Sequence, residues 1–450
     1  MKITRPQEAG ALLRISLPLI FAYLADVAMV VTIKAVVGKL GYRELGAVGI
    51  SLDISYQIAI VIMGFFSVVG VLASTALGAK RREDVLPALA QGMVLAGVLG
   101  AVLTLVVLKL DWVLAAARQD PAVIALARPF FEIFAWSLLP MIWFTVMRAF
   151  VAALMRTGFV LFITIVTVVL NYFLMNGLVH GLYGLPAIGV AGAGLSWTIA
   201  MWFKCVCLAG YTAFLIHQQK LVYPGRSWFH GALRLSELVR LGLPVGGIVG
   251  LESGLFAAVS LMSGALGTIA LASYQMMMAW IAVPFVVSLG FSEAAMVRVS
   301  FWAGARNGAA ARQAGNLAMI IGVAIPLVLI SVPVFAPRVI TDTFLSPGDE
   351  GYGAIATLVV DLLLIAAVFQ VFDGLQAVAS HALRGLQDTV IPLVIAGTGY
   401  WLVGLGLSYA LAFPLGYGVH GLWWGLALGL IFTGSLLAWR FERLASRLVL

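Results

Sequence analysis

Residues 15–37 read ISLPLIFAYLADVAMVVTIKAVV, and residues 241–263 read LGLPVGGIVGLESGLFAAVSLMS. Both stretches are continuous apolar runs, and each exceeds the roughly 20 residues that a helix needs to cross the hydrocarbon core of a bilayer. Neither alternates apolar with polar residues, as the strands of a membrane barrel do. The second stretch begins 226 residues after the first (241 minus 15) and aligns without a gap, so that Asp26 meets Glu252. The two stretches therefore predict transmembrane helices at equivalent places in a repeated fold.

The composition of the whole chain agrees with a membrane environment. Hydrophobic residues make up 62% of the 450 residues, charged residues make up 10%, and the mean hydropathy is +1.07. A soluble globular protein has about 45–50% apolar and about 25% charged residues. Because the membrane interior offers no hydrogen-bond partner to the backbone, helices are the remaining architecture. The predicted fold class is an all-α integral membrane protein.

Twelve apolar runs of sufficient length follow one another along the chain, and the repeat divides them into two sets of six. We expect spans at residues 15–37, 46–78, 87–109, 122–147, 158–180, 187–216, 241–263, 269–300, 314–336, 353–380, 389–412 and 418–438. The predicted organisation is an amino-terminal lobe (1–216), a cytoplasmic linker (217–239) and a carboxy-terminal lobe (240–450). Transporters built from such repeats carry their sites between the repeats.

The positive charges set the predicted orientation. If the amino terminus is cytoplasmic, most of the 27 Lys and Arg residues fall at the cytoplasmic ends of the spans. The reverse topology would contradict the rule that cytoplasmic loops are rich in Lys and Arg. We therefore expect a multi-pass protein of the bacterial inner membrane, embedded in the lipid bilayer, with both termini in the cytoplasm. The same loops account for the net charge of +8, so this charge predicts no nucleic-acid partner.

Three carboxyl groups fall near the middle of their spans. Asp26 and Glu252 each lie 12 residues after an arginine that opens the span, and Asp373 lies 11 residues before an arginine that closes its span. At 1.5 Å per residue these offsets are about 17 Å, which is roughly half the thickness of the hydrocarbon core. A charged side chain at that depth is costly and normally faces a cavity or a partner.

Two interpretations of these carboxyl groups are open. Burial favours the protonated form of a carboxyl group and an arriving cation favours the ionised form. Glu252, Asp373 and Asp26 could thus form a cation-coupling site at which ion and substrate compete. They could instead form a structural polar cluster. Lys204, near the middle of the sixth span, could neutralise Asp26 in a buried ion pair, whereas we expect Lys34 to reach the membrane interface.

The stretch YQMMMAW at residues 274–280 offers the thioether and aromatic surface found at promiscuous apolar sites. Ordinary helix packing explains this pattern equally well. A substrate cavity here would use aromatic, thioether, amide and basic side chains. The candidates are Phe256, Tyr274, Gln275, Met278, Gln370 and Lys204.

Two long stretches give the chain a family resemblance. They are FQVFDGLQAVASHALRGLQDTVIPL at residues 369–393 and LGLPVGGIVGLESGLFAAVSLMSGALGTIALASYQ at residues 241–275. With them, the chain resembles the multidrug and toxic compound extrusion (MATE) transporters over nearly its whole length, especially the NorM-like branch.

The resemblance implies two six-helix lobes around a central V-shaped cleft, and export of organic cations by antiport with Na⁺ or H⁺. It also implies that Glu252 and Asp373 are the cation-coupling acids and, for a sodium-coupled protein, metal ligands. The family's acidic position in the first helix falls here on Ile33. Asp26 lies seven residues earlier, on nearly the same helical face, and either replaces that acid or is paired with Lys204.

The sequence thus predicts a secondary active antiporter that exports amphipathic organic cations or related small metabolites by alternating access of two lobes. The alternative is a lipid-linked glycan flippase of the same superfamily, which would favour a strongly cationic cavity. An enzyme is not expected, because the five histidines are scattered and no catalytic motif accompanies them. We expect a monomer without a cofactor other than the coupling ion.

Overall fold

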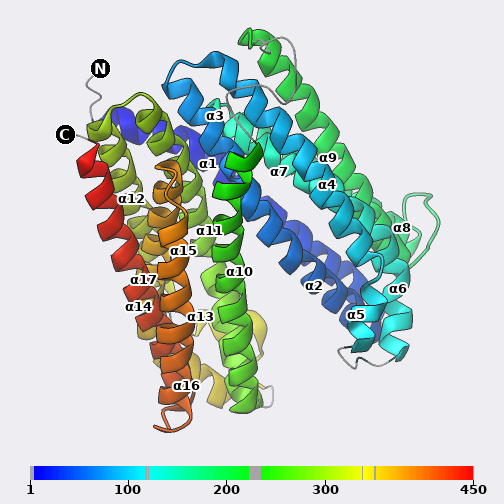
Figure 1. Ribbon diagram of the computed structural model, residues 1–450. Coiled ribbons are helices and arrows are strands. Elements are labelled where there is room, and N and C mark those ends of the chain that lie inside the picture. Colours follow the sequence, from blue (N-terminus) through cyan, green and yellow to red (C-terminus); the bar gives the residue numbers. More distant parts are fainter. Residues whose placement is uncertain are drawn as a thin grey trace. The chain divides into compact units, whose positions relative to one another are not determined.

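The computed structural model describes residues 5–116, 119, 121–221, 235–336, 338–348 and 351–448, apart from the side chains of residues 42 and 332–334. Every regular element in these ranges is a helix (Figure 1). Twelve helical segments in them are long and apolar enough to cross a membrane. The prediction of an all-α protein with twelve transmembrane helices is therefore confirmed. Most of the predicted linker at 217–239 lies outside the described residues.

The chain forms two compact units, which we describe separately. Unit 1 consists of residues 1–16 and 243–450, and unit 2 consists of residues 17–242. The predicted lobes place residues 1–16 with the amino-terminal half of the chain, whereas in the structure they belong to unit 1. An ion pair explains this placement, because Glu8 in this segment binds Arg298 of the same unit.

Two helices carry the chain from one unit to the other. They are α1 (Arg5–Gly38) and α10 (Leu235–Ala265), since the unit boundaries fall inside them. The boundaries are equivalent in the repeat, because residue 242 is residue 16 plus 226. Each lies two residues before a proline inside the helix, Pro18 or Pro244. Proline removes a backbone hydrogen bond and is a common cause of helix kinks.

Unit 2 contains eight further α-helices within the described residues. They are α2 (Tyr42–Phe66), α3 (Val68–Gly78), α4 (Val85–Val107), α5 (Leu110–Ala116), α6 (Pro121–Phe134), α7 (Leu138–Ala153), α8 (Gly158–His180) and α9 (Val190–Gln218). Short 3₁₀ turns, η1 (Arg82–Asp84) and η2 (Ala135–Ser137), precede α4 and α7.

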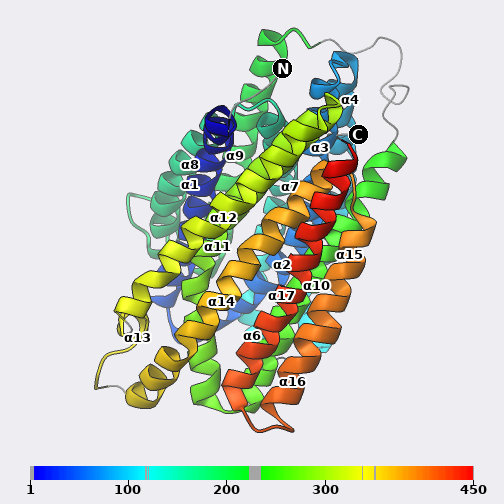
Figure 2. The same cartoon turned by 90° about the vertical axis from the view of Figure 1, so that its left-hand side faces the viewer.

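Unit 1 continues α10 with a second set of helices. They are α11 (Thr268–Gly304), α12 (Gly308–Phe335), α13 (Val339–Phe344), α14 (Tyr352–Gly385), α15 (Val390–Gly397), α16 (Gly406–Ala412) and α17 (Gly418–Arg447). Between α15 and α16 the chain winds as a π-helix, η3 (Thr398–Leu405). Helices α11, α12, α14 and α17 run side by side (Figure 2).

Three spans that the hydropathy pattern predicts as single helices are composite. The second span changes helix at Ser67, the fourth contains η2, and the eleventh contains η3. Hydropathy is insensitive to these changes, because each composite span remains apolar throughout.

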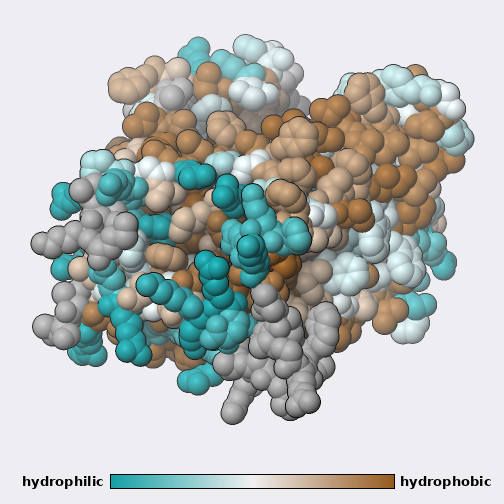
Figure 3. All heavy atoms as spheres, turned by 90° about the horizontal axis from the view of Figure 1, so that it is seen from above, coloured by the Kyte–Doolittle hydropathy of each residue, from teal (hydrophilic) through white to brown (hydrophobic). Residues whose placement is uncertain are grey.

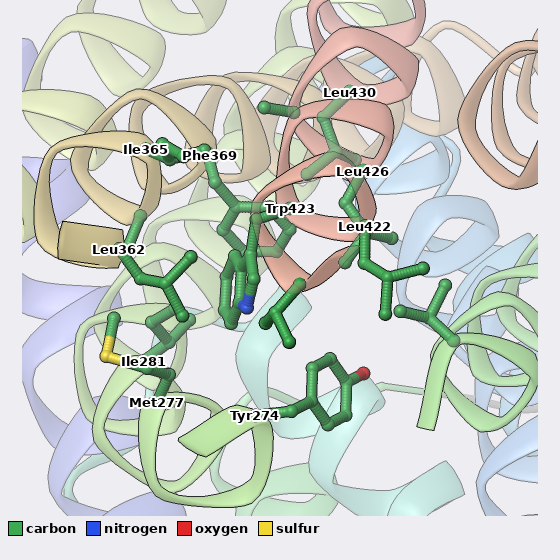
Figure 4. Packing of buried hydrophobic residues seen from close by; sticks show 14 of the residues in the cluster. Tyr274, Met277, Ile281, Leu362, Ile365, Phe369, Leu422, Trp423, Leu426 and Leu430 are labelled. Carbon is green, nitrogen blue, oxygen red and sulfur yellow. The ribbon is translucent and has the colours of Figure 1, made fainter. Parts of the chain in front are cut away.

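The hydrophobic core of unit 1 forms where α11, α14 and α17 meet. Trp423 of α17 is fully buried, and its ring centroid lies 5.6 Å from that of Phe369 on α14 and 5.8 Å from that of Tyr274 on α11. Figure 4 shows these rings surrounded by aliphatic side chains from the same three helices. Packing in this core therefore fixes the position of Phe369 along the axis of α14, and with it the positions of the polar residues that follow on the same helix.

The outer surface agrees with a membrane environment. Large apolar side chains such as Leu261, Leu364 and Leu402 are more than two-thirds exposed. Hydrophilic side chains gather at the helix ends seen in Figure 3, and hydrophobic ones cover the flanks. Exposed apolar flanks with polar ends are the pattern expected of helices solvated by lipid.

Candidate cation site

Glu252 on α10 and Asp373 on α14 belong to unit 1 and act on each other electrostatically. Gln376, one helical turn after Asp373, donates a hydrogen bond from Nε2 to Glu252 Oε1 over 3.0 Å. The hydroxyl of Tyr400, in η3, donates to Gln376 Oε1 over 2.7 Å. Both ends of the Gln376 amide are therefore used, and three helical segments converge on one carboxylate.

The π-helical segment η3 places two neighbouring aromatic side chains on different helices. Tyr400 reaches Gln376 on α14, whereas Trp401 Nε1 donates to the backbone carbonyl of Leu251 on α10 over 3.1 Å. Leu251 directly precedes Glu252. Short π-helical segments are rare and recur at functional sites. Through these two bonds η3 supports both the backbone and the carboxylate of Glu252.

Close helix packing positions Asp373. A Cβ atom added at the next residue, Gly374, would lie 2.9 Å from the carbonyl oxygen of Gly322 on α12 and 2.9 Å from Ser288 Oγ on α11. Ser288 Oγ itself donates to the Gly322 carbonyl over 3.0 Å. Small residues allow membrane helices to approach this closely. Glycine at 374 therefore permits the approach of α14 that sets the position of Asp373.

The oxygens near Asp373 are suited to a cation. Asp373 Oδ1 and both amide atoms of Gln370 are buried and have no hydrogen-bond partner among the described residues. Gln370 and Asp373 are three residues apart and therefore lie on one face of α14. Buried polar atoms without a partner are rare in native structures. Carboxylate and amide oxygens are the ligands of hard cations.

These oxygens differ from a multidentate metal site. Within the described parts of the chain, no group of three or more His, Cys, Asp and Glu side chains could hold a metal ion. Glu252 and Asp373 are two acids supplemented by the neutral amides of Gln370 and Gln376.

The predicted substrate residues of unit 1 occupy different environments. Tyr274 is buried against Trp423, and its hydroxyl donates to the Phe256 carbonyl over 3.2 Å. Phe256 and Met278 pack, partly buried, against the same core. Gln275 is exposed and bonds to a serine hydroxyl of α10. Three of these side chains thus have packing roles, and a shared substrate cavity stays a prediction.

In unit 2, Asp26 and Lys204 form the ion pair that the sequence left open. Lys204 Nζ on α9 lies 2.5 Å from Asp26 Oδ1 on α1, and the side chains are 4% and 32% exposed respectively. The ammonium group also lies 4.4 Å from the ring centroid of Phe144 on α7. The pair holds three helices of unit 2 together. In this arrangement the charge of Asp26 is already balanced.

The end of α1 differs from the middle in polarity. Ile33, at the position where the resemblance implies an acid, is fully buried. Lys34 is exposed and lies 3.4 Å from Asp53 Oδ1, which is also exposed. The structure therefore offers no buried carboxylate at residue 33, and it places the neighbouring charges on the surface.

Sequence reasoning missed several polar residues of unit 1. Gln376 and Arg384 lie in the quoted stretch 369–393, and the spacing of Gln376 from Asp373 would have placed both near one face. Tyr400 lies in a different span from Gln376, so no local sequence pattern links it to α14. Glu8 precedes the first apolar run and lies 290 residues from Arg298 in the sequence, so no local sequence pattern predicts this ion pair.

Within the described residues, twelve helical segments of membrane length, some of which carry buried ionisable side chains, are typical of a polytopic membrane transporter. The family model MatE matches the chain twice, at residues 18–176 and 244–410. The two matches begin 226 residues apart, at Pro18 and Pro244, in agreement with the internal repeat.

Relatives and solved structures match over almost the whole chain. The multidrug resistance protein NorM of Burkholderia vietnamiensis is 37% identical over 446 residues, which cover 97% of this chain and 94% of that protein. A probable multidrug resistance protein NorM of Pseudomonas putida is 33% identical and covers 100% of this chain and 97% of its own length. An outward-facing multidrug resistance MATE family transporter of the MOP superfamily has a TM-score of 0.89 at 18% identity, covering 100% of this chain and 99% of that one.

The chain belongs to the MatE family of membrane transporters. Its relatives named above are bacterial, and its helices are of membrane length, which together indicate a bacterial inner-membrane protein. Members of this family are transporters rather than enzymes, and they need no cofactor.

Proposed function

We propose that the protein is a secondary active antiporter that exports amphipathic organic cations or related small metabolites in exchange for Na⁺ or H⁺. The observation that carries this proposal is the site of Glu252 and Asp373. Glu252 is bonded to Gln376, one helical turn after Asp373, and buried oxygens of Asp373 and Gln370 have no hydrogen-bond partner among the described residues. The relatives are named as multidrug resistance proteins, which agrees with drugs as exported substrates.

In this proposal the two carboxyl groups hold one kind of cation at a time. Protons or a sodium ion bind to them in one state, and an organic cation binds in their place in the other. Gln376 orients the carboxylate of Glu252, and Tyr400 in turn fixes the Gln376 amide. Because an ion and a substrate that compete for one site cannot occupy it together, entry of one requires departure of the other.

Alternating access requires that the units move, and the chain offers two places for bending. The unit boundaries fall inside α1 and α10, shortly before Pro18 and Pro244. We expect both termini in the cytoplasm and a monomeric transporter. A glycan flippase is less well supported, because the buried Lys204 is neutralised by Asp26 and adds no net positive charge with it.

Transport in proteoliposomes tests the proposal. The purified protein is reconstituted, and uptake of the amphipathic cation ethidium is followed while sodium and pH gradients are imposed separately. We expect one of the two gradients to drive transport of ethidium against its own gradient. Transport that follows only the ethidium gradient, with neither ion gradient having an effect, would remove the antiport proposal.

A further inference from the structure

A cluster of charged and aromatic side chains lies inside unit 2 and has no part in the proposed exchange at Glu252 and Asp373. It joins three helices at two levels. At the first level, Lys204 Nζ on α9 lies 2.5 Å from Asp26 Oδ1 on α1. The same ammonium group lies 4.4 Å from the ring centroid of Phe144 on α7. At the second level, the guanidinium carbon of Arg148 on α7 lies 4.7 Å from the ring centroid of Tyr23 on α1.

The two levels are neighbouring turns of the same helices. Tyr23 and Asp26 are three residues apart on α1, and residues at that spacing lie on one helix face. Phe144 and Arg148 are four residues apart on α7, which places them on one face as well. The facing surfaces of α1 and α7 therefore carry one continuous cluster, to which α9 contributes Lys204.

The cluster contains two basic groups and one carboxylate. Asp26 is bonded to Lys204. Four other acidic residues in the described part of unit 2 lie in the first turns of their helices, namely Glu44, Glu83, Asp111 and Glu237. Three more have basic partners outside the cluster, namely Asp53, Asp84 and Glu132. The cluster therefore carries a net positive charge.

Part of the cluster is accessible. The Asp26 side chain is 32% exposed, and Tyr23 and Arg148 are partly buried. Because Asp26 lies near the middle of its span, its exposed part is expected to face a water-filled space rather than lipid. Arg156 differs, since it follows the end of α7 and is exposed, as expected of a charge that sets the orientation.

We propose that this cluster binds an anionic group of the transported molecule, with Arg148 as its main ligand. The inference rests on the proposed function and narrows the substrate class to amphipathic zwitterions that carry a carboxylate. The proposed exchange selects a cationic group, and the net positive charge of the cluster selects an anionic one. A guanidinium binds a carboxylate through two parallel N–H donors. Lys204 is buried and already donates to Asp26, so it contributes through its charge.

Two related dyes separate recognition of a carboxylate from recognition of a cation. Tetramethylrhodamine carries a carboxylate and a delocalised positive charge, and its methyl ester keeps only the positive charge. Fluorescence anisotropy measures the binding of each dye to the purified protein in detergent. We expect Arg148→Gln to weaken binding of the free acid roughly tenfold, because it removes a hydrogen bond between charged groups. Binding of the ester should not weaken.

Two further variants make the comparison specific. Arg148→Lys keeps the charge but loses the planar pair of donors, so its affinity for the free acid should fall between those of Arg148→Gln and the unmodified protein. Arg156→Gln is the matched control and should bind both dyes as the unmodified protein does. Equal weakening for the two dyes, or no change for either, in a folded Arg148→Gln protein would overturn the proposal. If Arg148→Gln does not fold, Arg148→Lys is judged by the same criterion.

Transport of the same dyes in proteoliposomes separates this inference from the proposed function. If an ion gradient drives transport of the ester but the protein does not bind the free acid, the anionic subsite has failed and the antiport stands. If neither dye responds to a sodium or pH gradient, the antiport has failed. Binding of the free acid that depends on Arg148 would in that case still support the subsite.

Discussion

Glu8 and Arg298 are separated by 290 residues and joined by two hydrogen bonds, from Arg298 Nε to Glu8 Oε1 over 2.7 Å and from Nη2 to Oε2 over 2.6 Å. Trp302 Nε1 also approaches Glu8 Oε2, and the guanidinium lies over the rings of Phe301 and Trp302. The side chains of the pair are only 2% and 6% exposed. Through this pair the first segment of α1 is attached to unit 1.

Glu8→Gln should destabilise the protein strongly. The substitution leaves the buried guanidinium of Arg298 without its carboxylate, and breaking a buried pair from one side costs about 3–5 kcal/mol. The apparent melting temperature of the purified protein in detergent measures the effect. The exposed pair Arg128–Glu132 provides the control, because Arg128→Gln should leave the melting temperature unchanged. Equal melting temperatures for Glu8→Gln and the unmodified protein would contradict a structural role of the pair.

Lys204→Met should lower stability, and adding Asp26→Asn should restore much of it. The single change leaves Asp26 without its ammonium partner, whereas the double change removes both charges. Residues in direct contact typically show coupling energies of about 0.5–3 kcal/mol in such a cycle. Melting temperatures of the four proteins measure the coupling. Strictly additive effects would contradict the pair, and loss of ion-driven transport in the stable double variant would give Asp26 a coupling role.

Tyr400→Phe should weaken ion coupling without abolishing transport. The change removes the donor to Gln376 Oε1 and frees the amide that orients Glu252. A hydrogen bond contributes about 0.5–1.5 kcal/mol net, so we expect the half-saturating ion concentration to rise roughly threefold to tenfold. Dose–response curves of ethidium exchange measure it. Tyr409→Phe, at an exposed tyrosine of the same span, should behave as the unmodified protein; equal shifts in both variants would refute the specific role.

The fold could be predicted from the sequence to the level of spans and repeat. Hydropathy locates all twelve spans, because lipid selects apolar residues along the whole length of a helix. It cannot show that the eleventh span is wound as a π-helix between residues 398 and 405, since the winding depends on contacts with other helices. Nor can it show that residues 1–16 pack with unit 1, because Glu8 finds its partner 290 residues away.

The candidate site could be predicted in part. The depth argument selects Glu252, Asp373 and Asp26, because charged residues within apolar spans are few. The hydrogen bond from Gln376 to Glu252 was not predicted, since Gln376 is neutral and the bond depends on how α10 and α14 face each other. The pairing of Asp26 with Lys204 was among the alternatives, because two opposite charges buried in one half of the chain are expected to meet.

The central claim is that Glu252 and Asp373 carry the exchange of ion and substrate. The most direct test measures ion-gradient-driven ethidium transport by the double variant Glu252→Gln/Asp373→Asn in proteoliposomes, after its folding has been checked by its elution from a sizing column. We predict that the folded variant loses the response to both sodium and pH gradients. Gradient-driven transport at the rate of the unmodified protein would contradict the account.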